Sequence, residues 1–294
     1  VTLKAPDGAF LAKLANPGAV LVIMPASEAA SREPLRPPHL IGTGPYSIAE
    51  WSPGERIRLV RFDDYTRNVG VPASGLAGDK VAYFDEIWFV PMPEAGARVA
   101  GLETGEYQFG EGIPVTSLAR LEASSKLAAH IIKPKWKIAV NFNHHDSFFD
   151  NAPARQALLA AIDFNQVLAA VTAGKSEFYR AQPGLFFDEQ ATWHTTVGGD
   201  AYNHQDQELA KRLFAEAGYH GQELVMVTTR DFDWMYKTAL AIQAQLREIG
   251  VNVRLDLYDW AAQRAKTAEP TGWDFGTDGK SMRLDPNDFA PTFL

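Results

Sequence analysis

The sequence contains no cysteine. This absence excludes disulfides, thiolate catalysis and zinc sites built on cysteine ligands, and it is compatible with both the cytoplasm and the bacterial periplasm. No apolar run approaches the roughly 20 residues that are needed to cross a bilayer, so we expect no direct membrane span. The chain starts without Met or an export signal, and Val1–Ala5 has the pattern of the middle of a strand. We therefore expect a piece of a longer protein.

Basic residues are too few to hold a polyanion. Lys and Arg total 28 against 36 Asp and Glu, which gives a formal net charge of -8, and no long basic tract interrupts this balance. We therefore expect no nucleic-acid partner. The Gly-x-Ser-x-Gly elbow of a serine hydrolase is missing. The segment Gly42–Pro45 lacks the Lys-Ser/Thr of a phosphate-binding loop, so its glycines are expected to serve a turn.

The chain is long enough for two domains, and its 46% hydrophobic content is ordinary for a globular protein. Its most regular stretch, residues 223–259, has the pattern of a strand, a helix and a second strand. Apolar residues recur at helical spacing up to Gly250, a residue that a helix end favours, and then alternate with polar ones from 251 to 257. Strands joined by a helix lie parallel, so the pattern predicts an α/β fold.

The first corner of this unit, residues 228–236, is a candidate binding site. Ligands of open α/β sheets bind beyond the carboxyl ends of the strands. The corner carries charged and aromatic side chains that suit a zwitterionic ligand: Arg230, Asp231, Asp233, Trp234 and Tyr236. The alternative is a solvated loop in which Asp233 caps the following helix and Trp234 packs inward.

Shorter patterns predict further elements. Residues 46–51 and 56–61 form a predicted hairpin around Ser52–Glu55, where Pro53 and Gly54 suit a type II turn. A helix is predicted over 94–104. Further helices are predicted to begin near Pro153, at Asp163 with Gln166 completing a capping box, and at Asp206.

Six local patterns follow one another along the chain. They are IGTGPY at 41–46 with Trp51 and Pro53-Gly54, RVAGLETGE at 98–106, FDNAPARQALLAAID at 149–163, the segments 206–219 and 243–259, and Asp285-Pro286 with Phe289. In this order they resemble motifs of the family 5 extracellular solute-binding proteins, the dipeptide, oligopeptide and nickel receptors of ABC importers. The similarity covers essentially the whole chain.

The resemblance implies a two-lobe architecture of the periplasmic binding protein type II kind, with mixed sheets flanked by helices. Residues 1–40 would be the remnant of an N-terminal subdomain, 41–134 part of lobe one, and 135–294 most of lobe two. The hinge would lie near residues 133–143, with Asn141 and Asn143 as its residues. Because family members extend beyond both ends, the resemblance also implies a fragment that folds but binds its solute weakly or not at all.

The implied function is the capture of a small polar solute, with a short peptide expected first, between two lobes. The solute would be delivered to a membrane permease without chemical change, so we expect no enzymatic activity and no cofactor. The implied location is the periplasm, or the extracellular side of the membrane. A monomer is expected.

The resemblance places the solute near Trp273–Leu284, which is expected to be a loop. Peptide-binding members carry Trp and then Asp there; Lys280 and Met282 stand at about those positions. Asp278 could supply the acid, or the ligand could lack a free amine, which leaves peptide specificity open. The expected ligand-binding residues are Arg180, Arg230, Asp233, Trp234, Asp278, Lys280 and Arg283. For Arg180, the alternative is a surface ion pair.

Several alternatives stay open. A receptor for a metal chelate or an oligosaccharide would use stacking on Trp234 or Trp273. A carbohydrate-active or peptidase-like enzyme would need two convergent carboxylates. If the cleft is vestigial, the protein could instead be a chaperone-like binder of extended chains. His144-His145 could suggest a metal, but adjacent strand residues face opposite sides, so no metal site is expected.

Overall fold

The computed structural model describes residues 2–8, 10–15, 22–30, 40–75, 77–133, 136–283 and 285–286. Its contacts divide the chain into two compact units. Unit 1 comprises Val1–Glu94 with Leu284–Leu294, and unit 2 comprises Ala95–Arg283. The predicted lobe boundary at 134/135 refers to a longer protein, and it stays a prediction.

Unit 1 contains a three-stranded antiparallel sheet of order β1-β2-β3. The predicted hairpin is confirmed, because Gly54 has a φ of 78° and the Glu55 amide donates to the Ser52 carbonyl at 3.0 Å, as a type II turn requires. The elements of this unit are α1 (Phe10–Ala15), α2 (Ala26–Ala29), β1 (Tyr46–Ser52), β2 (Arg56–Arg61) and β3 (Glu86–Phe89).

The strand predicted at Val1–Ala5 is wrong for the residues that the structure describes. Residues 2–5 have no strand geometry, and Leu3 is 41% exposed; Val1 lies outside the described residues. A strand needs a hydrogen-bonding partner, and the alternation of apolar residues here is only a few residues long before Pro6.

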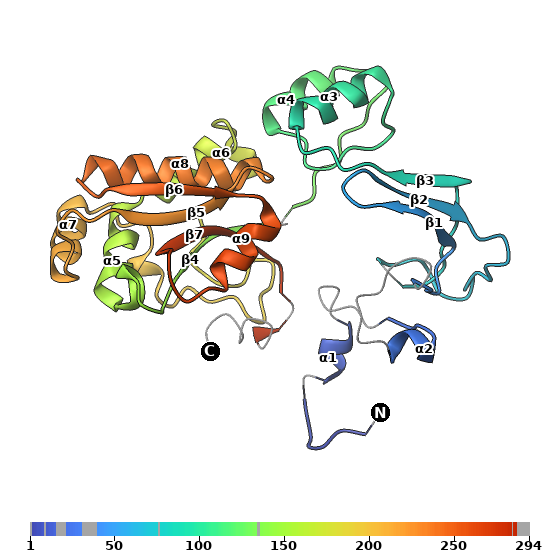
Figure 1. The fold of residues 1–294 in the computed structure, drawn as a ribbon, viewed down its shortest axis with the longest axis horizontal. Coiled ribbons are helices and arrows are strands. Elements are labelled where there is room, and N and C mark those ends of the chain that lie inside the picture. The colour runs from blue at the N-terminus through green and yellow to red at the C-terminus, as the bar shows by residue number, and fades with distance from the viewer. Residues whose placement is uncertain are drawn as a thin grey trace. The chain divides into compact units, whose positions relative to one another are not determined.

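Unit 2 holds a four-stranded sheet of order β4-β7-β5-β6, which Figure 1 shows with helix α8 along it. The elements of this unit, sheet strands included, are α3 (Ala95–Thr104), α4 (Val115–Glu122), β4 (Trp136–Phe142), η1 (Phe148–Asp150), α5 (Ala152–Ala161), α6 (Phe164–Val171), η2 (Ser176–Phe178), η3 (Gly199–Ala201), α7 (Gln207–Glu216), β5 (Leu224–Thr229), α8 (Asp233–Glu248), β6 (Val253–Tyr258), α9 (Trp260–Thr267) and β7 (Phe275–Ser281).

The predicted strand–helix–strand unit is confirmed. Strands β5 and β6 pair in parallel, α8 joins them, and Gly250 follows the helix with a φ of 84°. β7 pairs in parallel with β5 and antiparallel with β4, so the sheet is mixed. The carboxyl ends of β5, β6 and β7 therefore share one edge with the start of β4.

The helix starts of unit 2 follow the predicted caps, with one difference. Asn151 caps α5 and Asp206 caps α7 through their side chains. Asp163 caps α6, but its own amide donates to Gln245 Oε1 at 2.7 Å instead of to Gln166. The reciprocal half of the predicted capping box therefore comes from α8, 82 residues away in the sequence.

The loop predicted at Trp273–Leu284 is wrong over most of its length, because residues 275–281 form β7, one of the two inner strands of the sheet; Leu284 lies outside the described residues. Its glycines are the physical reason. A Cβ at Gly276 would lie 2.5 Å from Val227 Cγ2, and one at Gly279 would lie 2.6 Å from Trp234 Cη2. Glycine is thus required by close packing here and does not mark a turn.

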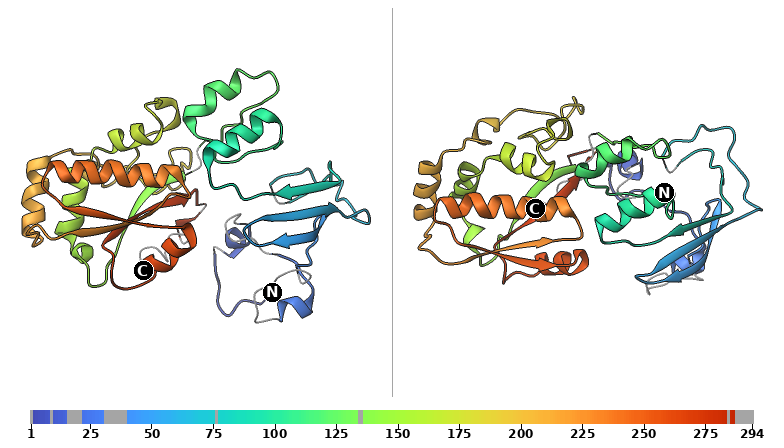
Figure 2. Two further views of the ribbon diagram at one scale, coloured as in Figure 1. Left: turned by 45° about the horizontal axis from the view of Figure 1, so that its top comes forward. Right: turned by 90° about the horizontal axis from the view of Figure 1, so that it is seen from above.

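The core of unit 2 lies on one face of this sheet. Phe149, Phe214 and Phe275 are almost completely buried there, together with apolar residues of α5, α7 and α8. Gly279 faces Trp234 of α8, and the neighbouring Asp278 faces the opposite side, where Arg264 of α9 lies. Figures 1 and 2 show α8 along one side of the sheet and α9 beside the other.

Candidate functional site

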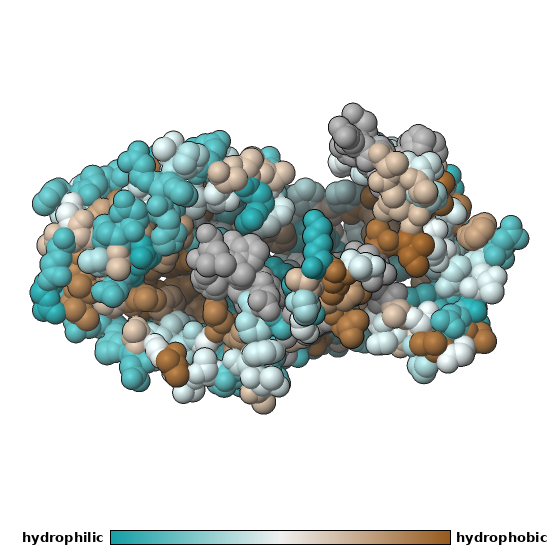
Figure 3. Space-filling model, turned by 90° about the horizontal axis from the view of Figure 1, so that it is seen from below, coloured by the Kyte–Doolittle hydropathy of each residue, from teal (hydrophilic) through white to brown (hydrophobic). Residues whose placement is uncertain are grey.

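Charged side chains gather where the strands of unit 2 reach their common edge. β5 ends at Thr229, β6 at Tyr258 and β7 at Ser281, while β4 starts there at Trp136. This is the edge at which open α/β sheets bind ligands. On the face shown in Figure 3, hydrophilic residues cover much of the surface of this sheet-bearing part, and apolar residues lie between them.

Asp278 is the centre of a buried polar cluster at this edge. Its side chain is 7% exposed, and its Oδ2 accepts hydrogen bonds from Lys280 Nζ at 2.8 Å and from Asn141 Nδ2 at 2.7 Å. Arg264 of α9 lies 3.4 Å from the same oxygen. Burial acts to raise the pKa of Asp278, but the hydrogen bonds and charge of Lys280, with Asn141, lower it below its ordinary value. The carboxylate is therefore ionised and already has its donors.

Two lysines stand opposite each other across β4 and β7. Lys137 and Lys280 are direct neighbours in the antiparallel register, an arrangement in which like charges repel. Lys280 is neutralised by Asp278, whereas Lys137 donates to the Gly184 carbonyl at 2.5 Å and lies 4.6 Å from the centre of the Phe187 ring. Burial lowers the pKa of Lys137 to about 8; the charge of Asp188 opposes this shift, and that of Arg180 adds to it.

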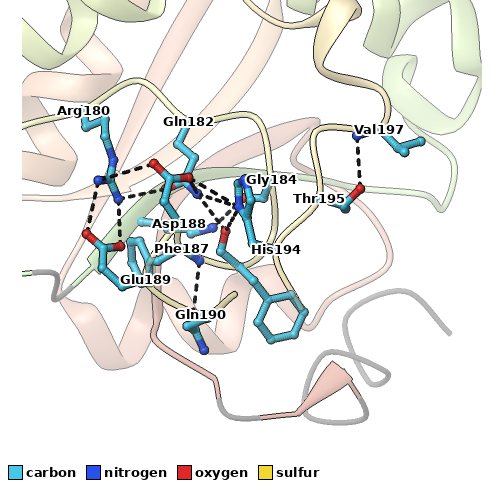
Figure 4. A network of polar contacts seen from close by, with 12 residues as sticks. Arg180, Gln182, Gly184, Phe187, Asp188, Glu189, Gln190, His194, Thr195 and Val197 are labelled. Atoms are coloured by element: carbon cyan, nitrogen blue, oxygen red, sulfur yellow. Dashed lines mark hydrogen bonds and ion pairs between the residues drawn. The ribbon is translucent and has the colours of Figure 1, made fainter. Parts of the chain in front are cut away.

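The segment 180–194 forms a polar network beside β4 (Figure 4). Arg180 pairs with Glu189 at 3.0 Å and with Asp188 at 3.4 Å, and all three side chains are about half exposed. Asp188 also lies 3.4 Å from His194 Nδ1. Arg180 therefore makes the ion pair that the sequence analysis gives as the alternative to an anion clamp.

Gln190 joins this network to the end of β7. Its Oε1 accepts from the Phe187 amide at 3.1 Å, and its Nε2 donates to the Arg283 carbonyl at 2.5 Å. The Arg283 side chain is half-buried, and its Nε is fully buried. Among the described residues, the Arg283 guanidinium has neither an ion pair nor a hydrogen bond.

The side chains of the corner between β5 and α8 each have a partner of their own and do not form one cluster. Arg230 stacks over the Tyr236 ring at 4.8 Å and donates to its hydroxyl at 3.2 Å. Asp231 accepts from the Trp260 amide, which ties the corner to the start of α9. Asp233 is the first residue of α8 and not its cap, and it pairs with Lys237 at 2.6 Å. Trp234 packs against Gly279 of β7, which is the inward packing given as the alternative.

The structure brings Asp278, Lys280 and Asn141 into one cluster, and Arg283 lies two residues after the strand that carries Asp278 and Lys280. Asn143 donates to the Pro270 and Trp273 carbonyls and so ties the end of β4 to the entry of β7. The assignment of Asn141 and Asn143 as hinge residues stays a prediction. The ligand-binding roles assigned to Arg180, Arg230, Asp233, Trp234, Asp278, Lys280 and Arg283 also stay predictions.

Three residues of this edge escape sequence reasoning: Lys137, Gln190 and Arg264. In the sequence, Lys137 is visible only as the last residue of the short basic passage 133–137, and nothing local indicates that Lys280 stands opposite it in the sheet. Gln190 lies in a segment without periodicity, and Arg264 sits on a short helix that the pattern does not reveal. The strand register places Lys137 opposite Lys280, and contacts between residues distant in the sequence place Gln190 and Arg264.

Neither a metal centre nor a membrane helix is found in the part of the chain that the structure describes. No three His, Asp or Glu side chains in that part come together as metal ligands, and the sequence has no Cys. None of the helices over those residues combines the length and the apolar character that a membrane span needs.

The architecture is that of a type II periplasmic binding protein. The solved structure of the periplasmic binding protein AgaA from A. tumefaciens R10, in complex with agropinic acid, matches with a TM-score of 0.68 at 27% identity. The match covers 95% of this chain and 53% of that one. The predicted fold class is therefore confirmed.

The chain belongs to the bacterial extracellular solute-binding proteins, family 5, whose middle-region profile matches residues 1–294. The probable peptide ABC transporter periplasmic-binding protein y4tO of Sinorhizobium fredii is 29% identical over all of this chain and 56% of its own length. The glutathione-binding protein GsiB of Pectobacterium atrosepticum is 27% identical over 97% of this chain and 54% of its own. The chain thus spans about half the length of these relatives.

Proposed function

We propose that this chain is part of the substrate-binding component of an ABC importer, and that the complete protein captures a small polar solute, in the first place a short peptide. The observation that carries the proposal is the match of all 294 residues to a solute-binding family. The charged edge of the four-stranded sheet supports it, since ligands of such sheets bind beyond the carboxyl ends of the strands.

The relatives' names support a solute of this kind. They describe a peptide transporter component, a glutathione-binding protein and a protein in complex with agropinic acid. Free peptides and glutathione are small and polar, and each carries a carboxylate. The cationic side chains at the edge, among them Lys137 and Arg283, suit such a group.

The mechanism we propose is closure of two lobes around an unchanged solute. Residues 41–134 would belong to lobe one and residues 135–294 to lobe two, with Asn141 and Asn143 at the hinge. A solute that contacts both lobes binds the closed form better, so it shifts the population toward that form. The closed receptor would then dock, as a monomer in the periplasm or on the extracellular side, on a membrane permease.

Isothermal calorimetry on the full-length protein and on residues 1–294 tests this proposal. The probes are a tripeptide library, glutathione, a nickel–histidine chelate and a set of oligosaccharides. We expect saturable binding of a peptide-like probe to the full-length protein, weaker binding to residues 1–294, and no chemical conversion of the probe. If only the chelate or only an oligosaccharide binds, the solute is of that class and not a peptide. If the protein converts a probe chemically, or binds none of them, the proposal is contradicted.

A further inference from the structure

Arg283 occupies an unusual position for an arginine in a folded chain. It lies two residues after the end of β7, its Nε is completely buried, and no described side chain or carbonyl accepts a hydrogen bond from its guanidinium. Burying a charged donor without an acceptor is strongly unfavourable, and such groups are normally paired. An arginine left in this state indicates an acceptor from outside the described residues.

The backbone of Arg283 is nevertheless fixed in place. Gln190 donates to its carbonyl at 2.5 Å and accepts from the Phe187 amide at 3.1 Å. The Phe187 ring in turn lies 4.6 Å from the ammonium of Lys137. Arg283 and Lys137 are thus linked through the same short segment, which leads back to the network drawn in Figure 4.

The charges at this edge do not balance. Asp278 is paired with Lys280 and Asn141, whereas Asp188 and Glu189 share the single positive charge of Arg180, so that Asp188 also attracts Lys137. These carboxylates therefore already have partners. Lys137 and Arg283 have no ion pair among the described residues, and Lys137 faces another lysine across the strands. Arg283 is therefore the cation at this edge whose charge meets no described partner, while Lys137 is a second positive charge nearby along the chain of contacts.

We propose that Arg283 holds the carboxylate of the solute, with Lys137 as the second cation of the same anion subsite. This inference rests on the proposed function and narrows the solutes to compounds that are bound through a free carboxylate. The planar guanidinium offers two parallel N–H groups to a carboxylate, which fixes the orientation of the ligand as well as its charge. Lys137 adds a point charge from the neighbouring strand.

The test uses the full-length protein and two matched tripeptide libraries, one with free carboxyl ends and one as carboxyl-terminal amides. We expect tight binding of the free acids and binding of the amides that is weaker by roughly 30-fold or more, the size typical for loss of one partner of a buried charge pair. In Arg283→Gln, the affinity for the free acids is expected to fall to that for the amides, and the affinity for the amides is expected to stay unchanged. Arg283→Lys is expected to restore part of the difference.

The matched control is Arg247→Gln, in the last turn of α8 at the other end of the sheet, which is expected to bind as the wild type does. Circular dichroism of each variant confirms folding. Equal binding of acids and amides, unchanged acid binding by Arg283→Gln, or binding of neutral oligosaccharides alone overturns the inference while the proposed function stands. If the wild type binds neither any of these probes nor a nickel–histidine chelate, the proposed function itself fails.

Discussion

Gly279 of β7 lies directly beneath the indole of Trp234 in α8. A Cβ at Gly279 would come within 2.6 Å of Trp234 Cη2 and 3.1 Å of its Cζ2. The aromatic ring of a residue that sequence reasoning assigns to ligand binding therefore covers the backbone of the strand that carries Asp278 and Lys280. This contact holds the β5–α8 corner on β7.

Gly279→Ala is predicted to lower the free energy of unfolding by about 1–3 kcal/mol, because the added methyl group overpacks this contact. Urea unfolding measures the change. The control is Gly96→Ala in α3, where a Cβ meets nothing within 4 Å and alanine favours the helix, so stability should not fall. A loss of equal size in both variants would contradict the packing explanation.

Asp278→Asn is predicted to lower the free energy of unfolding by about 3 kcal/mol, because it leaves the Lys280 ammonium, 22% exposed, without its partner. The control is Asp64→Asn, an exposed residue in unit 1, which should stay within about 0.5 kcal/mol of the wild type. If the two variants are equally stable, the cluster around Asp278 does not stabilise the fold.

The same carboxylate predicts a dependence on acid. The pKa of Asp278 is lower in the folded chain than its ordinary value of 3.8, so its contribution is present above that value and is lost as the pH falls through the lower folded value. The stability difference between wild type and Asp278→Asn should shrink below about pH 3.8. A difference that stays constant down to pH 2 would contradict this assignment.

The stability of the fold is also predicted to change at alkaline pH, because burial lowers the pKa of Lys137. Its pKa is about 8 in the folded chain because of burial, below the ordinary 10.5, so the unfolded chain holds this proton more tightly between these values. The wild type should therefore gain stability relative to Lys137→Met as the pH rises from 8 to 10.5. NMR titration of the lysine side chains gives a direct check: a Lys137 amine that titrates near 10.5 contradicts the burial argument.

Gln245 joins α8 to the start of α6. Its Oε1 accepts from the Asp163 amide at 2.7 Å, and its Nε2 donates to the Asp163 carbonyl at 3.2 Å. Gln245→Leu is predicted to lower the free energy of unfolding by about 1–3 kcal/mol, because both backbone groups lose their partner. The exposed Gln207→Leu is the control. Amide hydrogen exchange should be faster at Asp163 in the first variant only.

The parts of the fold that local pattern determines are predictable from the sequence. The strand–helix–strand unit at 223–259 is one case, because its apolar spacing and Gly250 all lie within 37 residues of each other. The hairpin around Gly54 is another, since the four residues of the turn determine its backbone conformation by themselves. In both, the residues that determine the element also belong to it.

Strand β7 and the cap of α6 are not predictable in this way. The glycines of β7 reflect Val227 and Trp234, which lie about 45–50 residues earlier, and Asp163 takes a partner from α8. The candidate site has the same limit. Asp278 and Lys280 can be selected by resemblance, but the pairing with Asn141 and the opposition of Lys137 follow from a register that no local pattern encodes.

Native mass spectrometry of the full-length protein, purified without refolding, tests the central claim most directly. The account predicts one small carboxylate-bearing solute per chain in the wild type. Denaturation should release it with its mass unchanged, and the Arg283→Gln variant should be free of it. A wild-type protein that carries no solute and binds none on addition, or one that converts its solute into another compound, would contradict the account.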